Sequence, residues 1–138
     1  MPQSTITPQI LALPEYSAES SYQIALTAAH TAADRKANDI LLLAIGEVSA
    51  LANYFVLTTG FSRAQIRAIA TTITEQIAEQ FERQPLHSSN NEDTGWILLD
   101  YGDVIVHIMM PQEREFYNLE AFWGHVTQLV LPRFERTT

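Results

Sequence analysis

The residues best suited to chemistry gather between Gly95 and Met109, in the stretch GWILLDYGDVIVHIM. Two carboxylates, Asp100 and Asp103, stand on either side of a Tyr-Gly pair, and His107 follows soon after. Carboxylate oxygens are preferred ligands of Mg²⁺ and Ca²⁺, and an imidazole exchanges protons near neutral pH. The stretch is therefore either an active or metal-binding site, or a surface that binds a partner.

Apolar and β-branched runs flank DYGD and predict the two strands of a hairpin. With Tyr101 and Gly102 as a two-residue loop, Asp100 faces Asp103 across the turn. One face of the hairpin is then wholly apolar: Ile97, Leu99, Val104, Val106 and Ile108. The opposite face is mixed: Trp96, Leu98, Asp100, Asp103, Ile105 and His107. A bulged turn with Gly102 in the left-handed region would instead slide the pairing by one residue and mix the two faces.

Two facing carboxylates are destabilising unless a donor or a cation relieves their repulsion. Backbone capping, a bound metal or a basic partner would each do so, and Asp and Gly also build turns of this kind. A metal site needs more ligands, and the sequence offers His107 but no third partner at a recognisable spacing. His107 is either a structural histidine or part of a binding face. Trp96 is either plain core or a half-exposed interface anchor.

Other chemical templates are missing from the sequence, so no cofactor or metal is predicted. The chain has no cysteine, which excludes disulfides, thiolate metal sites and cysteine nucleophiles. The segment Thr58 to Gln65, TTGFSRAQ, has the free helix-start amides that hold an anion. It lacks the glycines and lysine of a phosphate loop, so a capped helix is predicted there.

Two helices and two strands are predicted before the hairpin. Apolar spacing of three and four predicts a helix from about Ser20 to Lys36–Asn38, and the Ser62–Gln65 capping box starts a second helix that ends before Pro85. The second helix places one set of residues on a single face: Ile66, Ile69, Ile73, Ile77 and Phe81. Strands are predicted over 39–46 and 52–60, and their short link makes them antiparallel neighbours.

After the second helix, 85–95 is predicted to be a polar loop, and a helix is predicted from Pro111 to Gly124. Its candidate packing residues are Phe116, Leu119, Phe122 and Trp123. The element order predicts an α+β fold, an α/β sandwich in which helices cover a mixed sheet of four or five strands. We expect a flexible N-terminal extension over 1–19, one domain over 20–124 and a C-terminal tail over 125–138.

Charge predicts the class of partner. The chain of 138 residues carries a formal net charge of −8, and its eight basic residues are scattered from Arg35 to Arg136. This dispersal argues against nucleic-acid binding, while the acidity suits a basic protein partner. The start of the chain lacks the pattern of a secretory signal, and no apolar run reaches the ~20 residues that span a bilayer. We therefore expect a cytoplasmic protein that does not bind membranes.

Three stretches resemble the ribosomal silencing factor family, also called the Iojap family: GWILLDYGDVIVHIMMPQEREFYNLEAFW, ANDILLLAIG and ANYFVLTTGFSRAQIRAIA. The resemblance covers about Tyr22 to Gly124. Its most specific element is a tryptophan followed by D-x-G-D-V-I-V-H and Y-x-L-E-x-x-W: Trp96, Asp100, Gly102, Asp103 to His107, Tyr117, Leu119, Glu120 and Trp123.

The resemblance implies a translation repressor rather than an enzyme. Family members bind the large-subunit ribosomal protein L-fourteen and hinder joining of the small subunit when nutrients are scarce. Their fold is similar to that of nucleotidyltransferases but lacks the catalytic apparatus, and they tend to self-associate, which implies a homodimer. The chain departs from the family pattern at Asn53, usually aspartate, and at Gly60–Phe61–Ser62, usually Gly-Thr-Ser. These departures leave the hairpin unchanged.

The residues expected to bind the partner lie on the hairpin and the following helix: Trp96, Leu98, Asp100, Tyr101, Asp103, His107, Met109, Glu113, Tyr117 and Trp123. Aromatic side chains would supply apolar area, and Asp100 and Asp103 would meet Lys or Arg of a basic partner. Two alternatives stay open. One is a divergent nucleotidyltransferase with Asp100 and Asp103 holding magnesium, and the other is a self-associating module whose hairpin forms the dimer seam.

Overall fold

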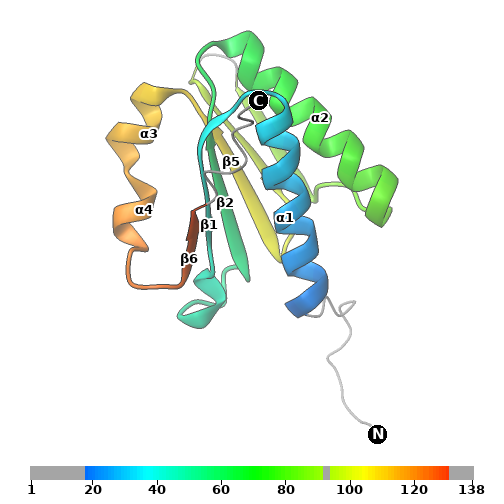
Figure 1. Cartoon of the computed structure of the whole chain (residues 1–138), viewed down its shortest axis with the longest axis vertical. Helices are drawn as coiled ribbons and strands as arrows, with labels where there is room; N and C mark the ends of the chain where they lie inside the picture. The colour runs from blue at the N-terminus through cyan, green and yellow to red at the C-terminus, as the bar shows by residue number, and fades with distance from the viewer. Residues whose placement is uncertain (1–17, 92–93, 131–138) are drawn as a thin grey trace, which may run out of the picture.

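A computed structural model describes residues 18–91 and 94–130, so most of the predicted N-terminal extension and the end of the predicted tail lie outside the described residues. Helices and strands form a mixed α+β fold, as predicted (Figure 1). The helices are α1 (Ala18–Asp34), α2 (Arg63–Phe81), α3 (Pro111–Tyr117) and α4 (Leu119–Phe122), with a short 3-10 turn at Ile45–Glu47. The strands are β1 (Asn38–Leu43), β2 (Tyr54–Thr59), β3 (His87–Asn91), β4 (Trp96–Asp100), β5 (Val104–Met109) and β6 (Gln128–Val130).

Within the described residues, the sheet has six strands in the order β3-β4-β5-β2-β1-β6. As predicted, β1 and β2 are antiparallel neighbours, and β4 and β5 form a hairpin. The sheet is mixed because β2 and β5 run parallel to each other. Both edge strands go beyond the predicted sheet of four or five strands, since β3 lies in the predicted polar loop and β6 in the predicted tail. The loop prediction for 87–91 is wrong because these residues pair with β4 through their backbone, and the exposed residues His87, Ser88 and Ser89 show that the strand needs no apolar side chains there.

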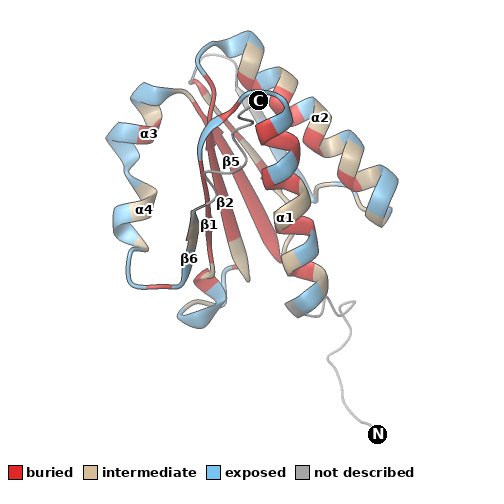
Figure 2. Cartoon of the chain, in the orientation of Figure 1, coloured by how far each residue is buried: buried red, intermediate tan, exposed pale blue. Residues whose placement is uncertain are grey.

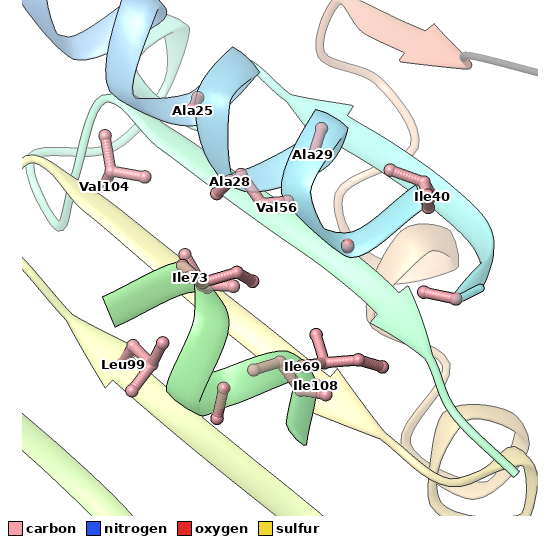
Figure 3. Close-up of a cluster of buried hydrophobic side chains, with 14 of the residues drawn as sticks. Ala25, Ala28, Ala29, Ile40, Val56, Ile69, Ile73, Leu99, Val104 and Ile108 are labelled. Carbon is pink, nitrogen blue, oxygen red and sulfur yellow. The ribbon is translucent and has the colours of Figure 1, made fainter. Parts of the chain in front are cut away.

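Helices α1 and α2 cover one face of the sheet (Figures 1 and 3). The alanines of α1 that face the sheet, including Ala25, Ala28 and Ala29, have no exposed surface, and their small side chains let the helix approach Val56 of β2 closely. From α2, Ile73 packs into the same cluster with the apolar face of the hairpin. The wholly apolar face predicted for the hairpin is therefore confirmed as the floor of this core.

The predicted capping box starts α2. The backbone N–H of Gln65 donates to Ser62 Oγ at 3.0 Å, and Gln65 Oε1 accepts from the backbone N–H of Phe61 at 2.7 Å. These two bonds satisfy amides that have no partner within the helix. At its other end α2 stops at Phe81, and Glu82 adopts a left-handed conformation before Pro85.

The substitution Ser62→Ala is expected to lower the free energy of unfolding by about 1 kcal/mol, because one amide of the first turn of α2 loses its partner. Urea denaturation followed by circular dichroism measures this loss. Ser88→Ala, on the exposed strand β3, is the matched control and should change the stability by less than about 0.5 kcal/mol. Equal effects of the two substitutions would show that the cap contributes nothing to stability.

The second face of the sheet is partly covered by α3 and α4 (Figure 1). The prediction of one continuous helix from Pro111 to Gly124 is wrong, because Asn118 takes a left-handed conformation with φ 44° and separates the two helices. Asparagine tolerates this conformation better than most residues. Phe116 and Phe122 expose 77% and 71% of their surface, so neither packs as predicted. Much of α3 and α4 is exposed (Figure 2).

Candidate partner-binding surface

The hairpin turns one residue later than predicted. Asp100 pairs with Ile105, and the backbone N–H of Tyr101 donates to the carbonyl of Val104 at 2.9 Å. The loop is therefore Gly102 and Asp103 rather than Tyr101 and Gly102, and the predicted pairing of Asp100 with Asp103 is wrong. Gly102 has φ +94°, which a two-residue hairpin turn requires at its first position and which glycine adopts without strain.

Both aspartates of DYGD form contacts within the protein. Asp100 Oδ1 accepts from the backbone N–H of Gly102 at 2.8 Å, which fixes the turn. Asp103 is buried and forms an ion pair with Arg83, with Arg83 Nη2 2.7 Å from Asp103 Oδ1. Ser21 donates to its other carboxylate oxygen at 2.6 Å. These contacts tie the start of α1 and the residue Arg83, just after α2, to the hairpin. The buried Asp103 uses both carboxylate oxygens within the protein, while the half-buried Asp100 stays a predicted binding residue.

Tyr101 also differs from its prediction as an interface residue. Its side chain has no exposed surface and joins the core under α1 and α2, because the later turn places it on the apolar face of the hairpin. The guanidinium carbon of Arg83 lies 5.9 Å from the centre of its ring. Burial raises the pKa of the Tyr101 hydroxyl. The residue is therefore part of the fold and not of an accessible surface.

Trp96 and His107 form a polar contact on the second face of the sheet. The indole N–H of Trp96 donates to His107 Nδ1 at 3.2 Å, and His107 has only 5% of its surface exposed. Burial, followed by the charge of Arg114, lowers the pKa of His107 to about 4. The neutral ring then carries its proton on Nε2, which has no hydrogen-bond partner within the described residues. His107 therefore orients Trp96 and is too weak a base to accept a proton near neutral pH.

An aromatic array continues from this pair in both directions. Tyr117 of α3 lies 4.7 Å from Trp96, measured between ring centres, and Phe116 lies 4.9 Å from Tyr117. On the other side of His107, Phe55 packs at 4.6 Å and Trp123 at 5.7 Å from Phe55. Such contacts hold the rings in fixed orientations. The array therefore runs from α3 across the sheet to Trp123, directly after α4.

An open groove of about 640 Å³ lies at the α3 end of this array. Its lining comes from β3, β4, the turn before β4 and α3: Ser89, Thr94, Trp96, Leu98, Gln112, Glu113, Phe116 and Tyr117. Four of the predicted binding residues therefore meet here, namely Trp96, Leu98, Glu113 and Tyr117. The groove combines exposed aromatic surface with a carboxylate, which is suited to a partner that brings apolar and basic side chains together.

The remaining predicted binding residues lie outside the groove. Met109 has no exposed surface, His107 supports Trp96 from beneath, and Trp123 packs against Phe55 at the other end of the array. Sequence reasoning missed Phe116 and Ser89, which it assigned to packing and to a loop. Phe116 lies on the same helix as Gln112 and Glu113, so the helix that carries the predicted residue Glu113 also brings Phe116 to the groove.

No group of three or more metal-ligating side chains comes together within residues 18–91 and 94–130. The two aspartates proposed as magnesium ligands point in different directions, one into the turn and one toward Arg83. In the same part of the chain, no helix has both the length and the apolar character needed to cross a membrane.

Residues 18–138 match a family described as ribosomal silencing factor during starvation. The chain is 40% identical to the chloroplastic protein Iojap of Zea mays over 108 residues, which are 78% of this chain and 46% of that protein. It is also 40% identical to the ribosomal silencing factor RsfS of Bacillus subtilis over 91 residues, 66% of this chain and 76% of that protein. The chain thus spans less than half the length of the plant Iojap proteins from Zea mays and Arabidopsis thaliana that it matches.

The fold is similar to that of a crystal structure of a Chromobacterium violaceum protein, with a TM-score of 0.69 and 31% sequence identity. The similarity covers 75% of this chain and 85% of that one. Sequence and fold agree, and the resemblance seen in the hairpin extends to both layers of the molecule. This chain belongs to the ribosomal silencing factor family.

Proposed function

We propose that the protein is a non-enzymatic translation repressor of the cytoplasm. It binds the large ribosomal subunit through ribosomal protein L-fourteen and prevents the small subunit from joining. Membership of the ribosomal silencing factor family supports this function. The observation that carries it is the groove between β4 and α3, where Trp96, Leu98 and Tyr117 form an apolar wall beside Glu113.

The groove offers the contacts that a basic protein partner needs. Phe116 and Tyr117 expose 77% and 49% of their surface, so a partner that covers them removes a large apolar area from water. Glu113 places a carboxylate against the backbone of Gly95, where a β-carbon would lie 2.8 Å from Glu113 Oε1. Lys or Arg of L-fourteen would pair with this carboxylate at the rim. Stable interfaces bury about 800 Å² on each partner, which the hairpin and α3 together can supply.

Silencing by this route requires only that the protein occupies its binding site on the large subunit. A protein seated on the face that the small subunit must reach excludes that subunit sterically and performs no chemical step. The nucleotidyltransferase alternative needs two carboxylates to converge on a magnesium ion. Here Asp100 caps the turn and Asp103 pairs with Arg83, which disfavours that alternative. The dimer-seam alternative concerns the same exposed aromatic face and is separated by the experiment below.

The substitution Phe116→Ala tests the groove. We expect it to weaken binding to L-fourteen and to large subunits by at least tenfold, because truncating a central interface aromatic typically costs about 1.5–2 kcal/mol or more. Phe122→Ala is the matched control, since Phe122 is also a largely exposed phenylalanine but lies on α4 outside the groove. Binding is measured by titration with isolated L-fourteen and by a subunit-joining assay, with light scattering to record the oligomeric state.

The wild-type protein in excess should abolish joining, and Phe122→Ala should do so equally well. If folded wild-type protein leaves joining unaffected, the proposed function is wrong. If Phe116→Ala binds L-fourteen as tightly as the wild type but converts a dimer into a monomer, the groove is the dimer seam rather than the docking surface.

A further inference from the structure

Three aromatic rings from β4 and α3 meet at the docking groove, and we refer to Trp96, Phe116 and Tyr117 as the ring cluster. The ring centre of Tyr117 lies 4.7 Å from that of Trp96 and 4.9 Å from that of Phe116. The ring planes are inclined by 52° and 87° respectively, so Tyr117 stacks face to face on neither neighbour. Part of the π surface of the ring cluster therefore stays open to an occupant of the groove.

Bonds within the protein join the two elements that carry the ring cluster. The indole N–H of Trp96 donates to His107 Nδ1 at 3.2 Å, which orients the ring on β4. The backbone N–H of Met110, directly before α3, donates at 2.9 Å to the carbonyl of Gly95, directly before β4. The start of α3 is therefore fastened to the start of β4, which limits the entropy that the site loses when an occupant binds.

A carboxylate lies beside the ring cluster because a glycine leaves room for it. A β-carbon on Gly95 would lie 2.8 Å from Glu113 Oε1 and 2.9 Å from both Cδ and Oε2 of the same side chain. Any other residue at position 95 would displace the carboxylate. Gly95 also has φ +70°, which L side chains rarely adopt. The turn before β4 therefore both joins α3 and seats Glu113 at the groove.

Glu113 makes the groove negative. Among the described residues that line the groove, it alone carries a charge. Arg114, the next residue on α3, is buried and pairs with Glu120 at 3.2 Å. Arg67 lines a different groove between α2 and β3, which Glu75 also lines. These two arginines thus have carboxylates of their own beside them, and the charge of Glu113 is available to an occupant.

The pairing of open rings with one carboxylate restricts what the groove can hold. An apolar side chain would cover the rings but would also take water from Glu113 without replacing its hydrogen bonds, which is costly. An anion would be repelled by the same carboxylate. A cation satisfies both parts of the groove, because the face of an aromatic ring attracts positive charge.

Arginine suits these two parts better than lysine does. Its guanidinium is planar and weakly hydrated, so it stacks on an aromatic face while its N–H groups form two parallel bonds to one carboxylate. The ammonium of lysine is compact and strongly hydrated, so more hydration is lost when it enters an apolar groove.

We propose that the groove takes an arginine side chain of its protein partner, with the guanidinium on the ring cluster and its N–H groups paired with Glu113. This inference rests on the proposed function for the identity of the partner. The preference for arginine is a property of the groove itself, so it can be measured with small probes and without a ribosome.

The probes are three capped peptides of the form Gly-Gly-X-Gly-Gly, in which X is arginine, lysine or citrulline. Citrulline keeps the planar shape of arginine but replaces the guanidinium with a neutral urea. The chain has two tryptophans, so an NMR titration follows two indole N–H signals, which Trp123→Phe assigns. Trp96 reports on the groove, and Trp123, which packs on Phe55 outside the groove, is the internal control.

The arginine peptide should shift the Trp96 signal in a saturable way at millimolar concentrations and leave the Trp123 signal unchanged. The lysine peptide should bind at least about threefold more weakly, and the citrulline peptide should produce no saturable shift. Equal shifts with all three peptides, equal shifts of both tryptophans, or no binding of the arginine peptide would overturn the inference.

Two substitutions test the two parts of the groove separately. Glu113→Gln should weaken binding of the arginine peptide about threefold, whereas Glu115→Gln, on the same helix but outside the groove, should not. Phe116→Leu keeps an apolar side chain but removes the ring, and it should also cost about threefold. Its matched control is Phe122→Leu on α4. The inference is wrong if each variant binds the peptide as its control does.

The same measurements separate this inference from the proposed function. If the peptides behave as expected but the folded protein leaves subunit joining unaffected, the arginine site stands and the proposed function fails. If joining is abolished and Phe116→Ala loses L-fourteen, but the groove does not distinguish arginine from citrulline, the proposed function stands and the arginine site fails.

Discussion

Asp103→Ala is expected to lower the free energy of unfolding by about 3–5 kcal/mol, since it leaves the partly buried Arg83 guanidinium without its ion-pair partner. The side chains of Arg83 and Asp103 expose only 15% and 6% of their surface, so water replaces the lost carboxylate poorly. Ser21 loses its acceptor in the same step. Because these contacts join the hairpin to α1 and to the end of α2, the substitution weakens the attachment of both helices to the sheet. Urea denaturation followed by circular dichroism measures it.

Asp100→Ala is the matched control for this experiment. Asp100 is half-buried and makes one bond to the turn, so its loss should cost only about 1 kcal/mol. A second test removes both charges, because Arg83→Met combined with Asp103→Ala leaves no unpaired ion. The double variant should lose less free energy of unfolding than Arg83→Met and Asp103→Ala lose in total when each is made alone. Equal, small losses for Asp103→Ala and Asp100→Ala would refute the structural role of the ion pair.

The hairpin sequence predicts the faces of its strands but not the position of the turn or the ion pair with Arg83. The alternation of apolar residues in the hairpin correctly predicts which face lies under the helices, since period two is a local property of a strand. The position of the turn depends on which loop residue has a positive φ. Gly102 is the first loop residue in the structure and the second in the prediction. The faces of the strands therefore stay as predicted, while Tyr101 leaves the loop and Asp103 enters it. Arg83, twenty residues upstream, is invisible to such local reasoning.

The groove was predicted in part for a similar reason. The shared surface of four residues could be predicted: Trp96, Leu98, Glu113 and Tyr117. The strand period places Trp96 and Leu98 on one face of the hairpin, and the family resemblance includes the helix that follows it. Phe116 was assigned to packing on one continuous helix, and a helical pattern does not indicate that the left-handed residue Asn118 ends α3. Strand β3 carries no apolar pattern at all, because an exposed edge strand is held by its backbone bonds to β4. Its contribution to the groove could therefore not be predicted.

Lowering the pH from 6.5 to 4 is expected to destabilise the wild-type protein more than a variant without the His107 imidazole. Burial lowers the pKa of His107 from its ordinary value of 6.5 to about 4 in the folded protein. His107 therefore binds a proton near pH 6.5 in the unfolded chain, but only near pH 4 in the folded protein. The stability from the neutral ring is complete above pH 6.5, falls as the pH drops toward 4, and levels off below it. A tenfold change in an equilibrium constant corresponds to about 1.36 kcal/mol, so the loss reaches at most about 3 kcal/mol.

His107→Gln provides the comparison, because its amide oxygen can still accept from the Trp96 indole but does not titrate in this range. Carboxylates begin to titrate near pH 4.5, so the difference between the two proteins from pH 6.5 to 5 comes from the imidazole alone. There the wild type should lose about 2 kcal/mol more than the variant in urea denaturation. The proton also converts Nδ1 from acceptor to donor, which breaks the bond that orients Trp96, so tryptophan fluorescence should change near pH 4 in the wild type alone. Parallel stability curves for the two proteins would mean that His107 takes up a proton equally well in the folded and unfolded states, which would contradict the lowered pKa of its buried ring.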